Sequence, residues 1–195
     1  MDPGRFVAAA TPRGARRTGQ SRTDRLVARR RGCSECPREK RGPLTGPNPV
    51  DRGKPGSKIH ALSDRVGLPL AVGVSAANTN DHHALKPLVK AIPAVRSRRG
   101  PRRARPTKLH ADKAYDVTEL RGWLCQRGIV PRIARKGIES SEKLGKHRWV
   151  IERSIAWLFG YRRLTIRYER HAHLFCAFLT LAAVLTCYKK LAKAK

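Results

Sequence analysis

Apolar residues follow two different periods along most of the chain, and this alternation constrains the fold more than any other sequence feature. Residues 58–63 alternate with period two, and the turn at Val66-Gly67 separates them from the apolar run 68–75. This is the pattern of a β-hairpin. Residues 82–92 instead carry apolar side chains at helical spacing, so we predict a helix that ends before Pro93.

The two periods continue to alternate towards the C-terminus. Residues 108–111 predict a strand, residues 117–127 a helix and residues 129–133 another strand. Strand, helix and strand in this order predict two parallel neighbours in one sheet. Two helices follow, from about residue 146 to 163 and from about residue 171 to 190. This order of elements indicates an α/β domain with helices on the faces of a sheet.

The last helix contains the longest apolar run of the sequence, from Leu174 to Tyr188. The run is shorter than the roughly 20 residues that span a bilayer. His171, His173 and Lys189 bound it on both sides. We therefore expect a buried helix of a globular domain, and no membrane partner.

Two segments are too rich in Arg, Gly and Pro to build a core. Residues 1–49 show almost no periodic apolar pattern, so we expect a basic segment with little stable structure. Residues 96–106 carry arginines between Gly and Pro and predict a mobile basic loop, which is either solvated or in contact with a DNA backbone. The predicted catalytic domain then covers residues 50–190, and residues 191–195 form a basic tail.

The balance of charge indicates the class of partner. Lysine and arginine total 43 against 14 acidic residues, which gives a formal net charge of +29. Such an excess opposes compact folding unless a polyanion neutralises it, so nucleic acid is the expected partner. Phosphate contacts carry affinity but no base identity. The charge alone therefore suits a ribosomal protein, a chromatin protein or a nuclease equally well.

The cysteines and the N-terminus indicate a reducing compartment. Cys33 and Cys36 form a single C-x-x-C pair without a second pair at zinc spacing, which argues against a zinc site. The other three cysteines are scattered, and the basic N-terminus lacks the apolar core of a signal peptide. We therefore expect a cytoplasmic protein. The seven histidines show no ligand spacing either.

Asp112 is the first of two candidate metal ligands. It directly follows the predicted strand 108–111, and ligands gather at the carboxyl ends of strands in parallel α/β sheets. The alternative is that Asp112 only caps a turn or pairs with Lys113 on the surface. Its position by itself does not decide between these roles.

Glu152 is the second candidate, because a carboxylate on an apolar helical face needs a partner. At helical spacing it shares a face with Trp149, Ile155, Ala156 and Phe159, which we expect to point inward. Arg148 lies four residues earlier and can supply an ordinary ion pair. The other option is a divalent cation held between Glu152 and Asp112.

Five motifs of the sequence are similar to those of one enzyme family. They are TGPNPVDRGKPGSK at residues 45–58, AANTND at 76–81, ADKAYD at 111–116, RIARKGI at 132–138 and HRWVIER at 147–153. Together with Trp157-Leu158 and Arg162-Arg163-Leu164, they resemble the IS5 group of bacterial insertion-sequence transposases, within the broader IS4-like family. The resemblance covers about residues 42 to 190.

The resemblance implies a fold, a cofactor and roles for individual residues. The family folds like ribonuclease H, with a mixed sheet flanked by helices and three acidic residues that bind two divalent ions, Mg²⁺ or Mn²⁺. By this resemblance Asp112 is the second carboxylate and Glu152 the third. Arg148 matches the arginine of the R-x-x-x-E pattern and orients Glu152. DNA, as element ends and as target, is the implied partner, the bacterial nucleoid the location, and a homo-oligomer is a possible state.

The sequence departs from the family where the first catalytic aspartate belongs. Counting back from Gly42 places Gly32 in that position. Pro37 is expected to interrupt a strand over residues 33–37, so the first catalytic strand is predicted to be damaged or missing. We expect a chain that is truncated or degraded on its N-terminal side. The arginine-rich sequence there is of the kind that translation of a shifted reading frame would produce.

Three functional hypotheses follow. The first is a DNA transposase whose strand cleavage and transfer are impaired, and the second a catalytically dead basic remnant that only binds DNA. In the third, Glu35, Asp51 or Asp64 replaces the missing aspartate, although Asp64 also suits a hairpin turn. The arginines expected to bind DNA phosphates are Arg96, Arg98, Arg99, Arg102, Arg103, Arg105, Arg153, Arg162, Arg163 and Arg167.

Overall fold

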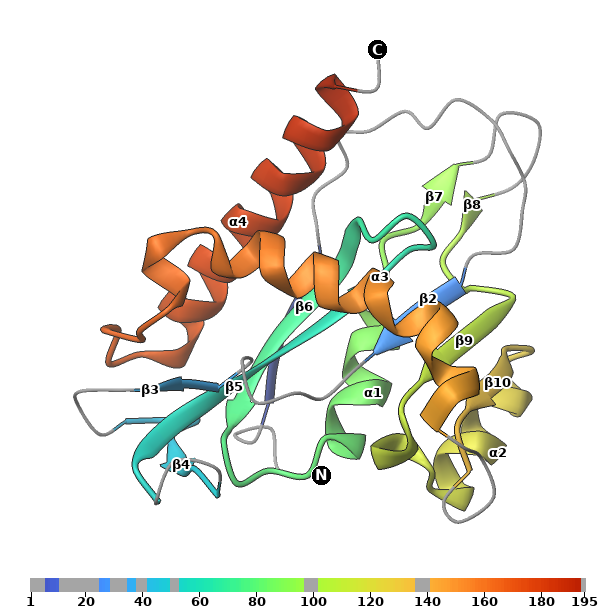
Figure 1. Ribbon diagram of the computed structural model, residues 1–195, viewed down its shortest axis with the longest axis horizontal. Helices are drawn as coiled ribbons and strands as arrows, with labels where there is room; N and C mark the ends of the chain where they lie inside the picture. The colour runs from blue at the N-terminus through green and yellow to red at the C-terminus, as the bar shows by residue number, and fades with distance from the viewer. Residues whose placement is uncertain are drawn as a thin grey trace.

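A mixed sheet with helices on both faces forms the centre of the molecule (Figure 1). The computed structural model describes residues 6–10, 25–28, 35–37, 42–49, 53–96, 102–135 and 141–193. The sheet strands are β1 (Phe6–Ala10), β2 (Arg25–Ala28), β3 (Glu35–Pro37), β4 (Gly46–Pro47), β5 (Pro55–Ser63), β6 (Pro69–Ala76), β9 (Lys108–Ala111) and β10 (Val130–Ile133). The helices are α1 (His82–Lys90), α2 (Thr118–Gln126), α3 (Ser141–Phe159) and α4 (Ala172–Ala192), with short 3-10 turns η3 (Lys113–Tyr115) and η4 (Arg162–Leu164).

The sheet is antiparallel on one side and parallel on the other. Its strand order is β1-β6-β5-β2-β9-β10, and β3 and β4 both pair with β5. The predicted hairpin is confirmed as the antiparallel pair β5 and β6, and the predicted parallel pair is confirmed as β9 and β10. β2 joins the two halves, since it runs antiparallel to β5 and parallel to β9.

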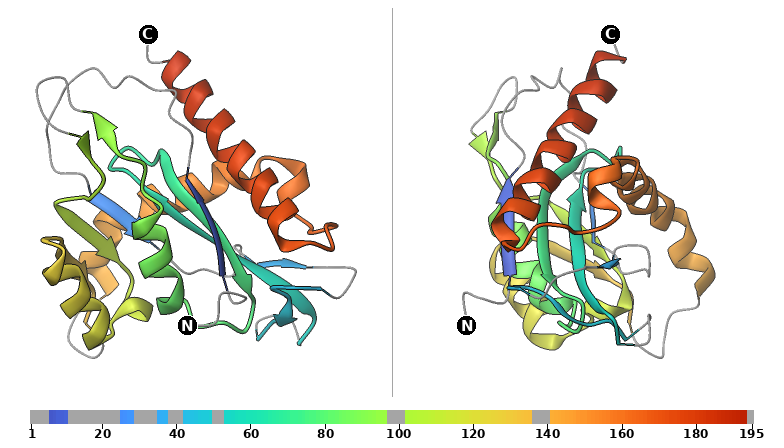
Figure 2. Two further views of the ribbon diagram at one scale, coloured as in Figure 1. Left: turned by 180° about the vertical axis from the view of Figure 1, so that it is seen from behind. Right: turned by 90° about the vertical axis from the view of Figure 1, so that its left-hand side faces the viewer.

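The period-two pattern of β5 and β6 divides their side chains between two cores. On one face, Leu62 and Ala71 join buried residues of α1 and α2. On the other face, Ile59 and Val72 join buried residues of α3 and α4. Figure 1 shows α3 crossing in front of β5 and β6, and the reverse view in Figure 2 brings α1 to the front. The prediction of helices on both sheet faces is therefore confirmed.

Four strands come from the segment 1–49, which we expected to hold little stable structure. For the residues of these strands, β1 to β4, the expectation was wrong. Strand pairing uses backbone groups and does not require a long apolar pattern, so short stretches can pair with the hairpin that the following residues build. Pro37 ends β3, which pairs with β5 alone, and proline is tolerated in such edge strands.

The expected loop at residues 96–106 is also partly ordered. Val95–Arg96 (β7) pairs antiparallel with Arg102–Arg103 (β8), and Arg96 lies opposite Arg102. Residues 97–101 lie outside the described residues. The basic segment therefore includes a two-stranded ribbon. The sequence did not predict it, because Gly and Pro residues are scattered through the segment.

The expectation of a buried C-terminal helix holds for one side of α4 only. Phe175, Cys176 and Leu179 are buried against the sheet. Leu181 is 54% exposed on the opposite side. By length and composition α4 is the one helix among the described residues that could cross a membrane, with 33% of its apolar window buried, and a single helix of this kind is weak evidence for a span.

Candidate active site at the end of strand β9

Asp112 lies at the carboxyl end of strand β9, in the parallel half of the sheet. The strand carries buried Leu109 and Ala111, and Asp112 follows at once as the N-cap residue of η3. Its Oδ1 accepts a hydrogen bond of 2.7 Å from the backbone N–H of Lys113. The carboxylate is half-buried. Asp112 therefore caps a turn, as one of the two sequence interpretations required, at a strand end where a metal ligand would also belong.

Glu152 lies on α3, but not on the face that we predicted. The buried positions of the described part of this helix are Val150, Ile151, Ser154 and Leu158, which turn towards the sheet. Glu152 is exposed and Trp149 is 51% exposed, so the expectation of an inward stripe around Glu152 was wrong. The helix has apolar side chains on more than one face, and only the packing against β5 decides which face is covered. The side chain of Arg148 lies outside the described residues.

The strand beside β9 brings no carboxylate to Asp112. Ala28 of β2 pairs with Ala111, the residue before Asp112. β2 reads Arg25-Leu26-Val27-Ala28 and contains no acidic residue. Gly32, the position that we predicted for the missing aspartate, lies outside the described residues.

Asp64 is buried in the turn that joins β5 to β6. Its Oδ1 accepts hydrogen bonds from the backbone N–H groups of Val66 at 2.8 Å and Leu68 at 2.9 Å. It is only 1% exposed. The structure thus gives Asp64 the hairpin-turn role that its sequence position suggested.

The sheet register also separates Asp64 from Asp112. Ser63 of β5, Val27 of β2 and His110 of β9 lie in one row across the sheet. Asp112 lies beyond this row in one direction and Asp64 in the other, because β5 and β9 run antiparallel. The two residues are about 10 Å apart along the strands and about 10 Å apart across them. Paired catalytic ions lie only about 4 Å apart, so Asp64 is poorly placed to share them with Asp112.

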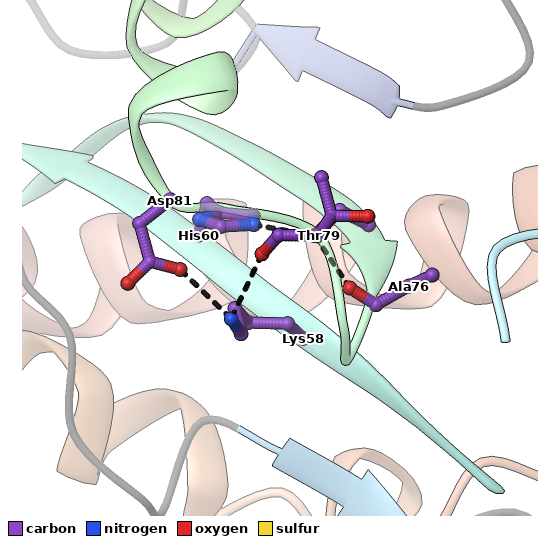
Figure 3. Close-up of polar contacts among 6 residues, drawn as sticks. Lys58, His60, Ala76, Thr79 and Asp81 are labelled. Carbon is purple, nitrogen blue, oxygen red and sulfur yellow. Dashed lines mark hydrogen bonds and ion pairs between the residues drawn. The ribbon is translucent and has the colours of Figure 1, made fainter. Parts of the chain in front are cut away.

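A buried polar network lies on the neighbouring hairpin (Figure 3). The Lys58 ammonium contacts Asp81 Oδ1 at 2.9 Å and donates a hydrogen bond of 3.0 Å to the carbonyl oxygen of Thr79. His60 Nε2 lies 2.8 Å from the hydroxyl of Ser75. Burial lowers the pKa of His60 to about 4, although the Asp81 carboxylate opposes the shift. His60 is therefore neutral near pH 7.

Tyr115 lies within electrostatic range of both Asp81 of this network and Asp112. Its ring is 1% exposed in the core between the sheet and α1. Burial raises the pKa of the Tyr115 hydroxyl, and the negative charges of Asp81 and Asp112 add to the shift. Both carboxylates therefore act on the same phenol. We did not single out Lys58, His60, Asp81 or Tyr115 from the sequence, although three of the motifs contain Lys58, Asp81 and Tyr115, because burial is what sets these residues apart.

Two of the motifs meet directly in the fold. A Cβ atom on Gly46 would lie only 2.1 Å from Asn78 Oδ1, so a larger residue at this position would require the Asn78 side chain to move. Gly46 pairs with Gly56 of β5, and Ser57 pairs with Ala76 of β6. The motifs at residues 45–58 and 76–81 thus form one packed end of the sheet.

Comparison with known proteins identifies the family. The family model described as "Transposase DDE domain" matches residues 31–187. The chain belongs to the DDE-domain transposases. It is also 46% identical over 188 residues to a protein from Burkholderia cepacia described as a transposase for insertion sequence element IS402. That alignment covers 96% of this chain and 88% of the relative. Transposition of an insertion sequence is accordingly the function of this chain.

The comparisons extend the similarity beyond the residues that we had recognised. We expected it to cover about residues 42 to 190, whereas the family model begins at residue 31 and the alignment takes in most of the segment 1–49. Much of the arginine-rich segment is therefore shared with the relative. Motifs with distinctive side chains were visible in the single sequence, but a diffuse similarity was not.

DDE-domain transposases generally use divalent metal ions. Within the described residues of this transposase, no three His, Cys, Asp or Glu side chains come together to hold one. Asp112 and Glu152 are both described, and neither belongs to such a group of three within that part of the chain. A site for two ions needs more carboxylate oxygens than two side chains supply. The described residues therefore do not fit a complete two-ion site.

The candidate DNA-binding arginines of this transposase differ in what they contact. Arg162 and Arg163 are exposed on η4, but Arg163 pairs with Glu169 at 2.9 Å. Arg153 is stacked between Trp149 and Trp157 and donates to the carbonyl oxygen of Val66. Arg105 is exposed and donates to the carbonyl oxygen of Arg127. Arg98 and Arg99, and the side chains of Arg96, Arg102 and Arg103, lie outside the described residues.

Arg167 was wrongly predicted to bind DNA. Its side chain is 0% exposed and donates hydrogen bonds to the carbonyl oxygens of Pro43, Leu44 and Glu169 and to the hydroxyl of Ser57. It ties the segment before α4 to the motif at residues 45–58. A planar guanidinium with five donors suits such a buried junction, where it satisfies several carbonyl oxygens at once.

Proposed function

We propose that this insertion-sequence transposase retains Asp112 and Glu152 as its catalytic carboxylates, oriented in part by Arg148, and that strand cleavage and transfer are impaired. The observation that carries the proposal is the absence of an acidic residue from β2 at residues 25–28, beside the strand that delivers Asp112. A missing carboxylate misplaces the reacting groups, and an error of about one ångström can cost roughly a hundredfold in rate.

The sheet supports a ribonuclease H-like arrangement for this proposal. Antiparallel β6 and β5 precede β2 in the strand order, and the parallel strands β9 and β10 follow it. β2, and not the segment 33–37 that the sequence suggested, then corresponds to the strand that carries the first acidic residue in intact relatives. Asp112 corresponds to the second carboxylate, at the end of the next strand. Glu152 projects from α3, which packs across β5 and β2.

Divalent ions, Mg²⁺ or Mn²⁺, would bind Asp112 and Glu152, and when bound they supply activation of the attacking nucleophile and charge neutralisation at the phosphodiester. In this chain the two carboxylates are expected to hold metal weakly, because the third is lacking from the described residues. Exposed arginines such as Arg105 and Arg162 would hold the phosphates of the element ends and of the target DNA. We propose the bacterial cytoplasm, at the nucleoid, as the location.

A plasmid that carries the chain's own element with its natural flanks tests the proposal. Cleavage at the element ends is measured with Mg²⁺ and with Mn²⁺ for the wild-type chain, Asp112→Asn and Glu152→Gln. Glu119→Gln is the matched control, because Glu119 is an exposed carboxylate on α2 that pairs with Lys86 of α1. We expect trace cleavage that both site variants abolish and the control retains. Robust Mg²⁺-dependent cleavage lost in Asp112→Asn would refute the impairment.

The second candidate function is a DNA-binding remnant without catalysis. It is favoured by the same gap in the carboxylate set, together with the net charge of +29. The two candidates differ in one result. If wild type and Asp112→Asn show identical background cleavage at excess protein with Mn²⁺, while both bind plasmid DNA equally, the chain is a remnant.

A further inference from the structure

The outer side of α4 carries a stripe of large apolar side chains that no other described element covers. Its members are Leu174, Phe178, Leu181, Leu185 and Tyr188, whose exposed fractions are 45%, 40%, 54%, 37% and 71%. We call these five residues the outer stripe. Contiguous apolar surface of this kind marks an interaction site far more often than a single exposed leucine does.

The spacing of the outer stripe is that of a helix that packs against another helix. Successive members lie four, three, four and three residues apart along α4. This spacing of apolar residues keeps a seam on one side of a helix and fits a second helix nearly parallel to the first. The sheet side of α4 has its own buried set, which includes Phe175, Leu179 and Ala183, so the outer stripe is not needed for the core.

We propose that the outer stripe binds the outer stripe of a second copy of this chain, with the two α4 helices antiparallel across a two-fold axis at Leu181. The stripe is nearly symmetric about this residue. Leu174 and Tyr188 lie seven residues away on either side, and Phe178 and Leu185 lie three and four residues away. A two-fold axis therefore places Leu174 opposite Tyr188 and Phe178 opposite Leu185, as an isologous interface requires.

Charge favours the antiparallel orientation. α4 contains no acidic residue, and Lys189 and Lys190 lie in its last turn. A parallel pair would place these lysines against the same lysines of the partner. An antiparallel pair separates the two basic ends by the length of the stripe, which is about 20 Å at 1.5 Å per residue. At the edge of the stripe, the Arg163 guanidinium lies 5.3 Å from the Phe178 ring and can remain in solvent.

The buried area suits a weak, specific dimer. With roughly half of each side chain open to solvent, the outer stripe offers on the order of 450 Å² per copy. Two copies then bury on the order of 1,000 Å² when the flanking exposed Ala177 is included, which is the lower bound for a specific interface. The expected dissociation constant is micromolar. This inference does not depend on whether the chain is catalytically active.

Sedimentation equilibrium of the purified full chain tests the interface. Nucleic acid is first removed with nuclease and high salt, because bridging DNA would also produce dimers. At about 100 µM, well above a micromolar dissociation constant, we expect twice the mass of one chain. We expect Leu181→Glu to restore the mass of one chain without lowering the urea midpoint, since this side chain is largely exposed. Val130→Glu is the matched control, because Val130 is 43% exposed on β10, and this variant should remain dimeric.

A cysteine variant tests the orientation. Leu181→Cys should form a disulfide between the introduced thiols of the two copies on mild oxidation, whereas Leu174→Cys and Tyr188→Cys alone should not. Equal cross-linking at all three positions would indicate a parallel pair and overturn the two-fold arrangement.

A wild-type chain that is monomeric at about 100 µM would overturn the dimer itself, as would a dimer that persists in Leu181→Glu. Co-flotation of a monomeric chain with phosphatidylcholine vesicles would assign the outer stripe to a membrane instead.

Discussion

Individual side chains in this transposase acquire their roles from what surrounds them. Arg167 and Arg162 have the same charge and lie five residues apart, yet one is fully buried and the other exposed. Lys58 and His60 lie on a strand whose eight residues from Gly56 to Ser63 are all buried. Their partners Asp81 and Ser75 come from the next part of the chain and offset the cost of burying polar groups.

His60 should make folding stability depend on pH. The folded pKa of about 4 lies below the ordinary value of 6.5. The unfolded chain therefore binds the proton first, and stability is full above pH 6.5 and declines as pH falls towards 4. Between pH 7 and pH 5 we expect a loss of about 2 kcal/mol from this residue. Urea unfolding at both pH values measures it.

The His60→Gln variant checks the assignment. It should weaken the pH dependence by the same amount, because glutamine does not titrate. His83→Gln, which changes an exposed histidine on α1, should leave the pH dependence as it is. An unchanged slope in His60→Gln would show that another group is responsible.

Single elements are positioned through a few contacts between distant segments. The turn between β5 and β6 docks on α3, where the Ser154 hydroxyl donates a hydrogen bond of 2.6 Å to the carbonyl oxygen of Gly67. Gly67 has a φ of +88°, in the region that favours glycine. Since α3 also carries Glu152, this contact helps to set the height of the helix over the sheet.

Gly67→Ala should destabilise the fold at this contact. The new Cβ would lie 3.1 Å from Ser154 Oγ and 3.3 Å from the carbonyl oxygen of Val150, in addition to the strain of the positive φ. We expect a loss of about 2 to 3 kcal/mol in urea unfolding. Gly53→Ala is the matched control, because Gly53 has a φ of +73° and open space around it. It should cost only about 1 kcal/mol, and equal costs would mean that the docking contact contributes nothing.

The whole molecule combines a large positive charge with an exposed apolar helix face. The net charge of +29 predicts binding to DNA that weakens steeply as salt is added. The outer stripe of α4 predicts self-association, which is apolar and is not weakened by salt. The two interactions can therefore be separated by ionic strength.

The salt dependence of plasmid binding tests which arginines contact phosphate. Arg162→Gln should lower the slope of log K against log salt by about one, because this exposed side chain can release one counterion from the DNA. Arg163→Gln should change the slope less, because Arg163 already pairs with Glu169 and lies over Tyr168. Equal effects of the two changes would argue against this difference in availability.

Local patterns were enough to predict the β5–β6 hairpin, the parallel pair β9 and β10, the helices and the family, but not strands β1 to β4 or the β7–β8 ribbon. These features depend on short-range periodicity, on turn residues and on motifs that one chain displays. Asp112 was located in the same way, because it directly follows a recognisable strand.

Which residues meet became clear from the three-dimensional fold. It placed β2 between β5 and β9, turned Glu152 outward, buried Arg167 and joined Lys58 to Asp81. It also left one side of α4 uncovered, although both sides of that helix carry large apolar residues. The physical reason is the same in each case. Burial and pairing depend on partners far away in the chain, and a local pattern carries no information about which partner will cover a given face.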